Sequence, residues 1–220
     1  MVSHSVSVVA LVLAVFLQAP AGQKTAAPDS AAEAGWTQLF NGRDFTGWRV
    51  SKPESFKVEN GAIAASGRAS HAYYDGPFLG HTFRNFELKV DVMTRNNSNG
   101  GVFILTEYVE KGWPSKGFEI QVNNTYMKDP VKTGSLYHVS DIKEQLVKDD
   151  EWFTEHIVVQ GDAITVKVND KQTVNWTQPK EWAGSPDFAK RVLSPGTVAL
   201  QAHDPNSTVY YKNIRIKPLK

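Results

Sequence analysis

The chain has 220 residues, of which 41% are hydrophobic and 21% charged, and its 24 Lys and Arg side chains nearly balance 23 Asp and Glu. This length and composition fit one globular domain with a short appendage. A net charge of +1 without any basic cluster argues against nucleic acid as a partner. The absence of cysteine excludes disulfides, thiol nucleophiles, Cys-ligated zinc and a lipid-modified N-terminal cysteine.

Residues 1–22 have the pattern of a secretory signal peptide. An apolar run from Val6 to Leu17, interrupted by a single serine, precedes the small residues Ala19 and Ala21 of a cleavage site. The run is far shorter than the roughly 20 residues that cross a bilayer, so a membrane anchor is the weaker alternative. We therefore expect a secreted or periplasmic protein without a membrane span.

Residues 23–35 are rich in alanine and lack hydrophobic periodicity, which is typical of a flexible leader. The folded domain is expected to occupy residues 36–220. Within it, short segments of alternating apolar and polar residues are separated by turn residues, and no long helical pattern occurs. The sequence therefore predicts an all-β protein, although it does not indicate the oligomeric state.

Turn residues mark the ends of about ten predicted strands. Asn60 and Gly61 predict one hairpin, and the dipeptides at 161–162 and 169–170 predict two more. The spacing suits a two-sheet β-sandwich or jelly roll. Residues 177–196 predict a surface loop or a short helix. Further strands are expected at 86–92, 102–105, 118–122, 157–160, 164–168, 173–176, 197–203 and 210–216.

Glu119 and Gln121 lie on one face of the predicted strand 118–122, and the apolar residues of that strand point the other way. A carboxylate and an amide placed in this way can hydrogen-bond sugar hydroxyls or handle a proton. The same alternation is typical of an ordinary solvated strand face, and spacing alone favours that interpretation.

His203 shares a predicted strand face with Ala199 and Gln201, where it could act as an acid, a base or a ligand. A structural histidine near a strand end is the commoner arrangement. The six histidines form no closely spaced ligand set, so the sequence gives little indication of a metal site.

Aromatic side chains near the strand of Glu119 could stack on sugar rings. Trp113, Tyr126 and Tyr137 fall in predicted loops there. Most aromatic residues belong to a core, and three tryptophans beside or within predicted strands are expected to do so: Trp36, Trp48 and Trp152.

An ordinary glycosidase needs a second carboxylate close to the first. Glu107, Asp129 and Asp141 are available, and no spacing selects one of them. The chain contains no Gly-x-Ser-x-Gly elbow, Walker loop or dinucleotide-binding glycine motif, so these enzyme classes have no support.

Seven phrases spread in order over most of residues 35–218 together resemble the 3-keto-disaccharide hydrolase family. One phrase alone would be weak, but seven in order make the resemblance fairly specific. They are GWTQLFNGRDFTGW (35–48), NFELKV (85–90), SNGGVF (98–103), GFEIQV (117–122), TGSLY (133–137), VALQAH (198–203) and YKNIRI (211–216).

The resemblance implies a concanavalin-like jelly roll, export, and action on glycosides already oxidised to a ketone at carbon 3. Such a ketone acidifies the hydrogen on carbon 2, so that one base can start elimination of the group on carbon 1. Glu119 matches the family's Glu-x-Gln strand and is the candidate base or metal ligand. His203 matches its Leu-Gln-x-His motif as candidate acid or ligand, and Gln121 is a candidate substrate contact.

The resemblance also suggests further substrate contacts and a metal ion. Arg95, Trp113 and Tyr137 are expected to bind substrate, and a divalent metal ion could stabilise the enolate. The turn at 97–101 departs from the family's usual register. His138 stands where related sequences often have glycine, so no role is transferred to it.

A noncatalytic carbohydrate-binding domain is the alternative function, because jelly rolls serve as lectins as well as enzymes. A catalyst should bring Glu119, Gln121 and His203 together in one polar pocket, whereas a lectin needs only an aromatic shelf and hydrogen bonds. The arrangement of these three residues therefore separates the two hypotheses.

Overall fold

The compact part of the chain, Gly35–Lys220, contains thirteen β-strands and two short 3-10 helices among its described residues. This computed structural model describes residues 1–2, 34–184 and 188–220. The predicted signal peptide and nearly all of the predicted leader therefore lie outside the described residues. In the described ranges, no helix has the length and apolar character needed to cross a membrane.

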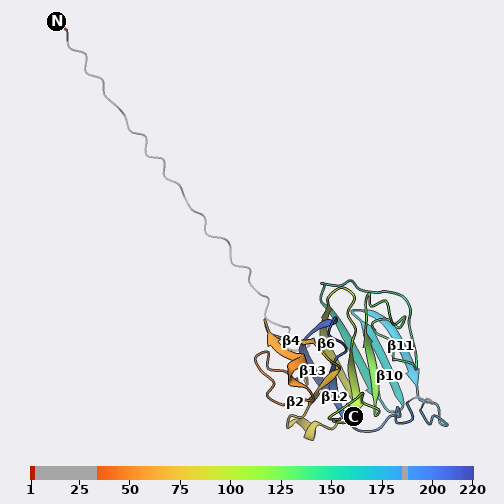
Figure 1. The fold of residues 1–220 in the computed structure, drawn as a ribbon. Coiled ribbons are helices and arrows are strands. Elements are labelled where there is room, and N and C mark those ends of the chain that lie inside the picture. Colours follow the sequence, from red (N-terminus) through yellow and green to blue (C-terminus); the bar gives the residue numbers. More distant parts are fainter. Residues whose placement is uncertain (3–33, 185–187) are drawn as a thin grey trace. The chain divides into compact units, whose positions relative to one another are not determined.

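The larger of two antiparallel sheets has the strand order β11-β10-β9-β6-β13-β4-β3, with β1 also paired to β13 (Figure 1). Its last strand in sequence, β13, therefore lies in the middle of the sheet. The strands are β1 (Thr37–Gln38), β3 (Phe56–Glu59), β4 (Ala62–Ser66), β6 (Phe86–Thr94), β9 (Phe153–Gln160), β10 (Ala163–Val168), β11 (Lys171–Thr177) and β13 (Thr208–Pro218).

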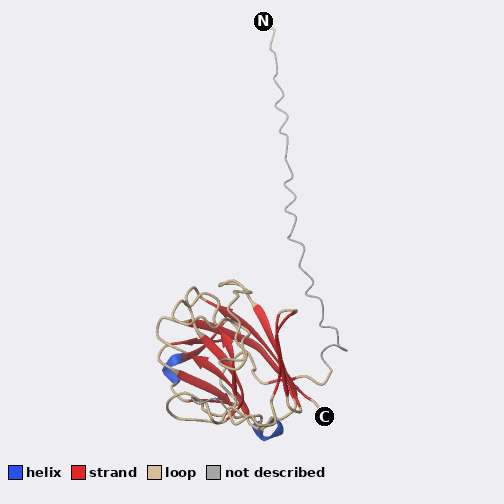
Figure 2. Cartoon of the chain, turned by 90° about the vertical axis from the view of Figure 1, so that its right-hand side faces the viewer, coloured by secondary structure: helices blue, strands red, loops and turns tan. Residues whose placement is uncertain are grey.

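The smaller sheet has the order β2-β5-β12-β7-β8 and forms the second layer of the sandwich (Figure 2). The 3-10 helices η1 (Pro53–Ser55) and η2 (Phe78–His81) lie in connections outside the sheets. The strands of this sheet are β2 (Trp48–Val50), β5 (Ser70–Tyr74), β7 (Gly100–Thr106), β8 (Phe118–Val122) and β12 (Thr197–Ala202).

Alternation of side chains builds the core between the two layers. Along β6, the apolar residues at every second position are completely buried, while Glu87, Lys89 and Asp91 face outward and are only half-buried. From the smaller sheet, Phe118 and Ile120 enter the same apolar cluster. The prediction of an all-β, two-sheet sandwich of jelly-roll type is confirmed.

The predicted turns also lie where expected. Asn60 and Gly61 connect β3 to β4, and Glu59 pairs directly with Ala62 across that hairpin. The two hairpins that join β9, β10 and β11 turn at the predicted dipeptides. Turn chemistry and period-two patterns were therefore sufficient to predict these elements.

Two of the three tryptophans predicted for the core lie outside it. Trp48 is buried, and its indole Nε1 donates a hydrogen bond to the Leu39 carbonyl at 2.9 Å. Trp36 is only half-buried. Trp152 is 40% exposed, because it precedes β9 on the surface, where the ammonium of Lys212 lies 3.8 Å from its ring centre.

Candidate active site

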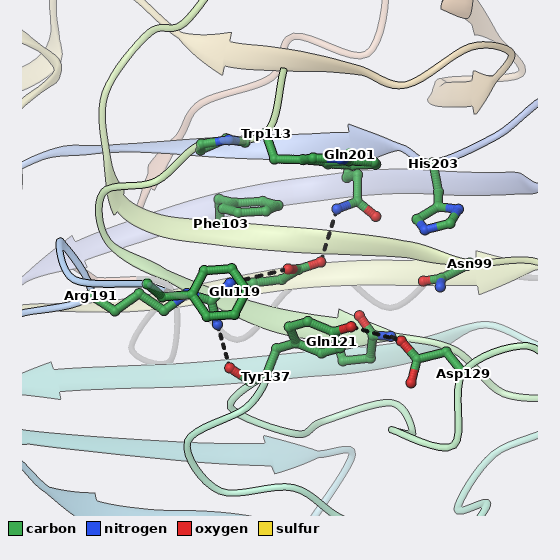
Figure 3. Close-up of a pocket in the computed structure, with 12 residues that line it drawn as sticks. Asn99, Phe103, Trp113, Glu119, Gln121, Asp129, Tyr137, Arg191, Gln201 and His203 are labelled. Atoms are coloured by element: carbon green, nitrogen blue, oxygen red, sulfur yellow. Dashed lines mark hydrogen bonds and ion pairs between the residues drawn. The ribbon is translucent and has the colours of Figure 1, made fainter. Parts of the chain in front are cut away.

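A pocket of about 280 Å³ opens on the face of the smaller sheet that points away from the core (Figure 3). Strands β7, β8 and β12 form its floor, and loops from three other parts of the chain form its walls. The residues that line it are Asn99, Phe103, Trp113, Pro114, Glu119, Gln121, Asp129, Tyr137, Phe188, Arg191, Gln201 and His203.

The antiparallel register explains why these floor residues meet. Phe103 pairs with Glu119 and Gly101 with Gln121, so all four lie on the outer face of β7 and β8. This face is not solvated in the ordinary way, because loops cover it. Glu119 is 6% exposed and Gln121 is 1% exposed.

Glu119 lies at the centre of the pocket, and two contacts fix its carboxylate. Gln201 Nε2 donates a hydrogen bond of 2.9 Å to Oε1, and Arg191 Nη2 lies 3.8 Å from Oε2. Burial raises the pKa of Glu119 to about 7, although Arg191 and Gln201 work against the shift. A carboxylate with this pKa can accept or return a proton near neutral pH.

Gly101 makes room for that carboxylate. A β-carbon added at this glycine would lie 2.5 Å from Oε1 of Glu119, which is inside van der Waals contact. Glycine is therefore the residue type that lets the carboxylate lie against the β7 backbone.

Arg191 reaches the pocket from the loop between β11 and β12 and is 3% exposed. Its guanidinium lies 3.7 Å from the centre of the Phe188 ring, and Nη1 donates to the Tyr137 carbonyl. Burial lowers the pKa of Arg191, and the charge of Glu119 opposes this shift. The arginine thus remains a fixed cation beside the buried carboxylate.

A second carboxylate, Asp129, lies on the pocket wall. It accepts a hydrogen bond of 2.9 Å from the Tyr137 hydroxyl and a longer one of 3.4 Å from Gln121 Nε2. The Val131 backbone N–H donates to its other oxygen at 2.8 Å. Burial, followed by the hydrogen bond to Asp129, raises the pKa of Tyr137, which therefore stays a neutral donor.

His203 borders the pocket as one half of a His–Asp pair. Its Nδ1 lies 2.8 Å from Oδ2 of Asp204, which also accepts a hydrogen bond from Ser207. Partial burial works to raise the pKa of Asp204, but the hydrogen bonds from His203 and Ser207 leave it lowered. An ionised Asp204 accepts a hydrogen bond from Nδ1–H, so Nε2 is the nitrogen left to act on a ligand.

Five of the six predicted site residues line this pocket: Glu119, Gln121, Trp113, Tyr137 and His203. Arg95 does not. Its Nη1 donates to Asp150 at 2.6 Å, and its guanidinium lies 5.2 Å from the centre of the Tyr210 ring. Arg95 is thus held by surface partners, because it follows the end of β6 in the larger sheet.

His138 does not line the pocket either. Its backbone N–H donates to Asp141 at 2.7 Å, and its ring packs on Tyr137 with 4.1 Å between ring centres. Among the three unselected carboxylates, only Asp129 lines the pocket. The residues that the sequence did not single out include Arg191, Asn99 and Phe103.

The donor set of the pocket does not fit a divalent metal ion. In the described residues, no three His, Asp or Glu side chains gather closely enough to hold one. Glu119, Asp129 and His203 each have a separate protein partner. Glu119 and His203 can instead transfer protons beside the fixed cation of Arg191.

Fold and pocket together define a jelly-roll β-sandwich with a buried carboxylate, an arginine and a His–Asp pair on one sheet. A solved candidate glycosyl hydrolase from Parabacteroides distasonis superimposes with a TM-score of 0.73 at 24% identity, covering 87% of this chain and 97% of its own. The carbohydrate binding module CBM66 from Bacillus subtilis superimposes with a TM-score of 0.57 at 12% identity, covering 78% and 95%. These likenesses establish the fold.

The chain belongs to the family of 3-keto-alpha-glucoside-1,2-lyase-like domains, whose sequence model matches residues 35–217. A curated relative from Bacteroides thetaiotaomicron, named 3-keto-disaccharide hydrolase, is 30% identical over 83 residues. That match covers 34% of this chain and only 29% of the relative's length. The family resemblance predicted from the seven phrases is confirmed.

Proposed function

We propose that the protein cleaves glycosides that carry a ketone at carbon 3, by removing the proton on carbon 2 and expelling the substituent on carbon 1. The single observation that carries this proposal is Glu119, a buried carboxylate whose pKa of about 7 suits a base at neutral pH. Support for the substrate class comes from the names of the family and of the Bacteroides relative.

In the first step, ionised Glu119 takes the proton from carbon 2, and the electrons of that C–H bond form an enolate with the neighbouring ketone. The cation of Arg191, 3.8 Å from Glu119, stabilises the negative charge that develops. Both side chains are buried, so this electrostatic stabilisation is stronger than at an exposed site.

In the second step, the enolate electrons form a double bond between carbons 1 and 2, and the bond from carbon 1 to the leaving oxygen breaks. Protonated His203 gives its Nε2 proton to that oxygen, while Asp204 holds Nδ1 and stabilises the imidazolium. In the view of Figure 3, His203 and Arg191 lie on opposite sides of Glu119.

Water then completes hydrolysis. It adds to carbon 1, neutral His203 accepts the proton that the water loses, and Glu119 returns its proton to carbon 2. Both side chains are thereby restored. The pocket amides of Gln121 and Asn99 and the ring of Trp113 are the proposed contacts to the sugar.

We also propose that the protein acts outside the cytoplasm. Support comes from residues 1–22 alone, which have the apolar run and small-residue cleavage pattern of a secretory signal peptide.

The test is cleavage of a 3-keto-disaccharide and of its unoxidised parent by the purified chain, with and without EDTA, alongside Glu119→Gln. We expect turnover of the keto substrate only, lost in the variant and unaffected by EDTA. Glu54→Gln is the matched control, because Glu54 is exposed in η1, outside the pocket.

Failure of the well-folded protein to cleave either compound would overturn the proposal. Measurable binding of the sugars in that case would favour the noncatalytic alternative. Loss of activity in EDTA, restored by a divalent metal, would contradict the metal-free steps described above.

A further inference from the structure

A second pocket, of about 330 Å³, opens on the outer face of the same small sheet. Tyr73 of β5 and Phe103 of β7 both pair with Ala199 of β12, so the three side chains share that face and contact one another. Phe103 lines the first pocket and Tyr73 lines the second. The two pockets are therefore neighbours on one surface.

The loop between β7 and β8 separates them. Trp113 and Pro114 of this loop border the first pocket, whereas Tyr108 and Lys116 border the second. The loop is fastened on the side of the second pocket, where the guanidinium of Arg49 lies 3.5 Å from the centre of the Tyr108 ring.

A β-bulge turns Thr106 toward the second pocket. Thr106 pairs with Thr197 and Phe103 with Ala199, so β7 has one residue more than β12 in this stretch. The extra residue brings Thr106 to the same face as Phe103. Leu105 has φ of 55°, and glycine at position 196 leaves space for its backbone, since a β-carbon there would lie 2.4 Å from the Leu105 carbonyl carbon.

Thr106 lines this pocket and carries an unpartnered hydroxyl. Thr106 is 1% exposed, and its Oγ1 is buried with no hydrogen-bond partner among the described residues. The neighbouring Thr197 differs, because its Oγ1 donates to the Tyr74 carbonyl at 2.6 Å. A buried hydroxyl without a partner costs free energy that a bound ligand with its own hydroxyls would recover.

The charges around the pocket favour a neutral ligand. Two cationic side chains, Arg49 and Lys116, are balanced by the carboxylates of Asp75 and Glu107. His81 also lines the pocket, with Nε2 3.6 Å from Asp75. The two carboxylates would repel an anion, and the two cationic side chains would repel a cation. A neutral molecule with many hydroxyls can instead accept from the cations and donate to the carboxylates.

We propose that this pocket is a second, noncatalytic binding site for a neutral sugar unit, separate from the pocket at Glu119. The site would hold a saccharide next to the reacting pocket without taking part in the chemistry. The inference depends on the proposed function only in expecting a saccharide as the ligand.

The test is a titration of the ¹⁵N-labelled full chain with glucose, galactose, xylose and maltose, followed by amide chemical shifts. We expect at least one sugar to give saturable shifts at Thr106, Gly196 and Thr197, and the same shifts in the Glu119→Gln variant. Thr106→Val keeps the side-chain shape and removes the hydroxyl, so it should weaken this binding about fivefold or more.

Thr177→Val is the matched control, because Thr177 is exposed at the end of β11 in the other sheet. This variant should bind the sugar as tightly as the wild type does. If Thr106→Val does not fold, Arg49→Gln at an exposed position provides the same comparison. Shifts confined to the first pocket, no saturable shift at all, or unchanged binding in the folded variant would overturn the proposal. Cleavage of the 3-keto-disaccharide is a separate readout, so the two proposals can fail independently.

Discussion

Glu119 shows how burial sets the behaviour of one side chain. A carboxylate on an exposed strand would be ionised throughout the neutral range, but this one is almost enclosed, and burial raises its pKa to about 7. Gln201 and Arg191 limit the shift, so that both protonation states are accessible near neutrality. A base that must return its proton needs this balance.

The pH dependence of cleavage should therefore show the titration of Glu119. The ionised base is the active form, so kcat/KM for a 3-keto-disaccharide should rise with pH through an apparent pKa near 7. Glu119→Gln should lower kcat by about 10² to 10⁴ fold. Initial rates between pH 5 and 9 measure both, and an acid limb near pH 4.5 would contradict the assignment of Glu119 as the base.

His203 is expected to matter most when the leaving group is poor. His203→Gln removes the proposed proton donor, so cleavage of a sugar leaving group should fall by about 10² fold or more. A 3-keto 4-nitrophenyl glycoside expels a stable phenolate and should lose less than about tenfold in kcat/KM. Equal losses on both substrates would instead indicate a structural role for the histidine.

At the scale of elements, strand register and glycine position decide whether the pocket can form. The pairing of β7 with β8 brings Phe103 beside Glu119, and the bulge at Leu105 divides the outer face of β7 between two pockets. Gly101 leaves the volume that the Glu119 carboxylate occupies. Adding one methyl group to β7 at Gly101 should therefore change the rate of cleavage.

Gly101→Ala tests that relation. The added β-carbon would lie 2.5 Å from Oε1, so the carboxylate must move, and we expect cleavage to fall by about 10² fold. The free energy of unfolding should fall by only about 1–3 kcal/mol. Gly161→Ala is the control, because its β-carbon meets nothing within 4 Å and its φ of 63° affects stability alone. Kinetics and denaturant unfolding of both variants make the comparison.

The limits of sequence analysis also lie at this scale. Alternation and turn residues predicted β6, β8 and the hairpins between β9 and β11, but not β5, whose sequence SHAYY does not alternate apolar and polar residues. Glu119, Gln121 and His203 could be found because the family phrases contain them. Their burial could not, since it depends on loops that fold over the sheet.

Arg191 gave no signal at all in the sequence. It lies in a loop without periodicity, and tertiary contacts hold it there: its carbonyl accepts a hydrogen bond from Trp182 Nε1 at 2.6 Å, and its side chain packs on Phe188. Arg95 was predicted to flank the concave face of the site. It does not, because it follows β6, which belongs to a different sheet from β8.

For the whole molecule, buried carboxylates should make stability depend on pH. Burial raises the pKa of Glu119 to about 7 and that of Glu155 well above its usual value. In the unfolded chain both groups lose their protons near pH 4.5, so between about pH 4.5 and 7 the folded state holds more protons and its stability falls as pH rises.

The contribution of Glu119 to that fall is on the order of 3 kcal/mol. We expect the free energy of unfolding in urea to be greater at pH 5 than at pH 7.5. Glu119→Gln cannot ionise and should reduce the difference between the two pH values, while Glu54→Gln should leave it unchanged. The buried His71, whose pKa burial lowers to about 3, contributes in the opposite direction in both proteins, so the comparison with the variant isolates Glu119. A variant that keeps the full wild-type difference would contradict the assigned burial.

The central position of β13 in the larger sheet has a consequence for how the protein is made. A ribosome delivers β6 and β4 long before residues 208–218, which are the strand that fills the space between them. Until then both strands present unpaired edges, and such edges associate readily with other chains. Pairings this distant in sequence also form slowly, in milliseconds to seconds. The newly synthesised chain thus passes through a period in which the exposed edges of its half-built sheet favour association with other chains.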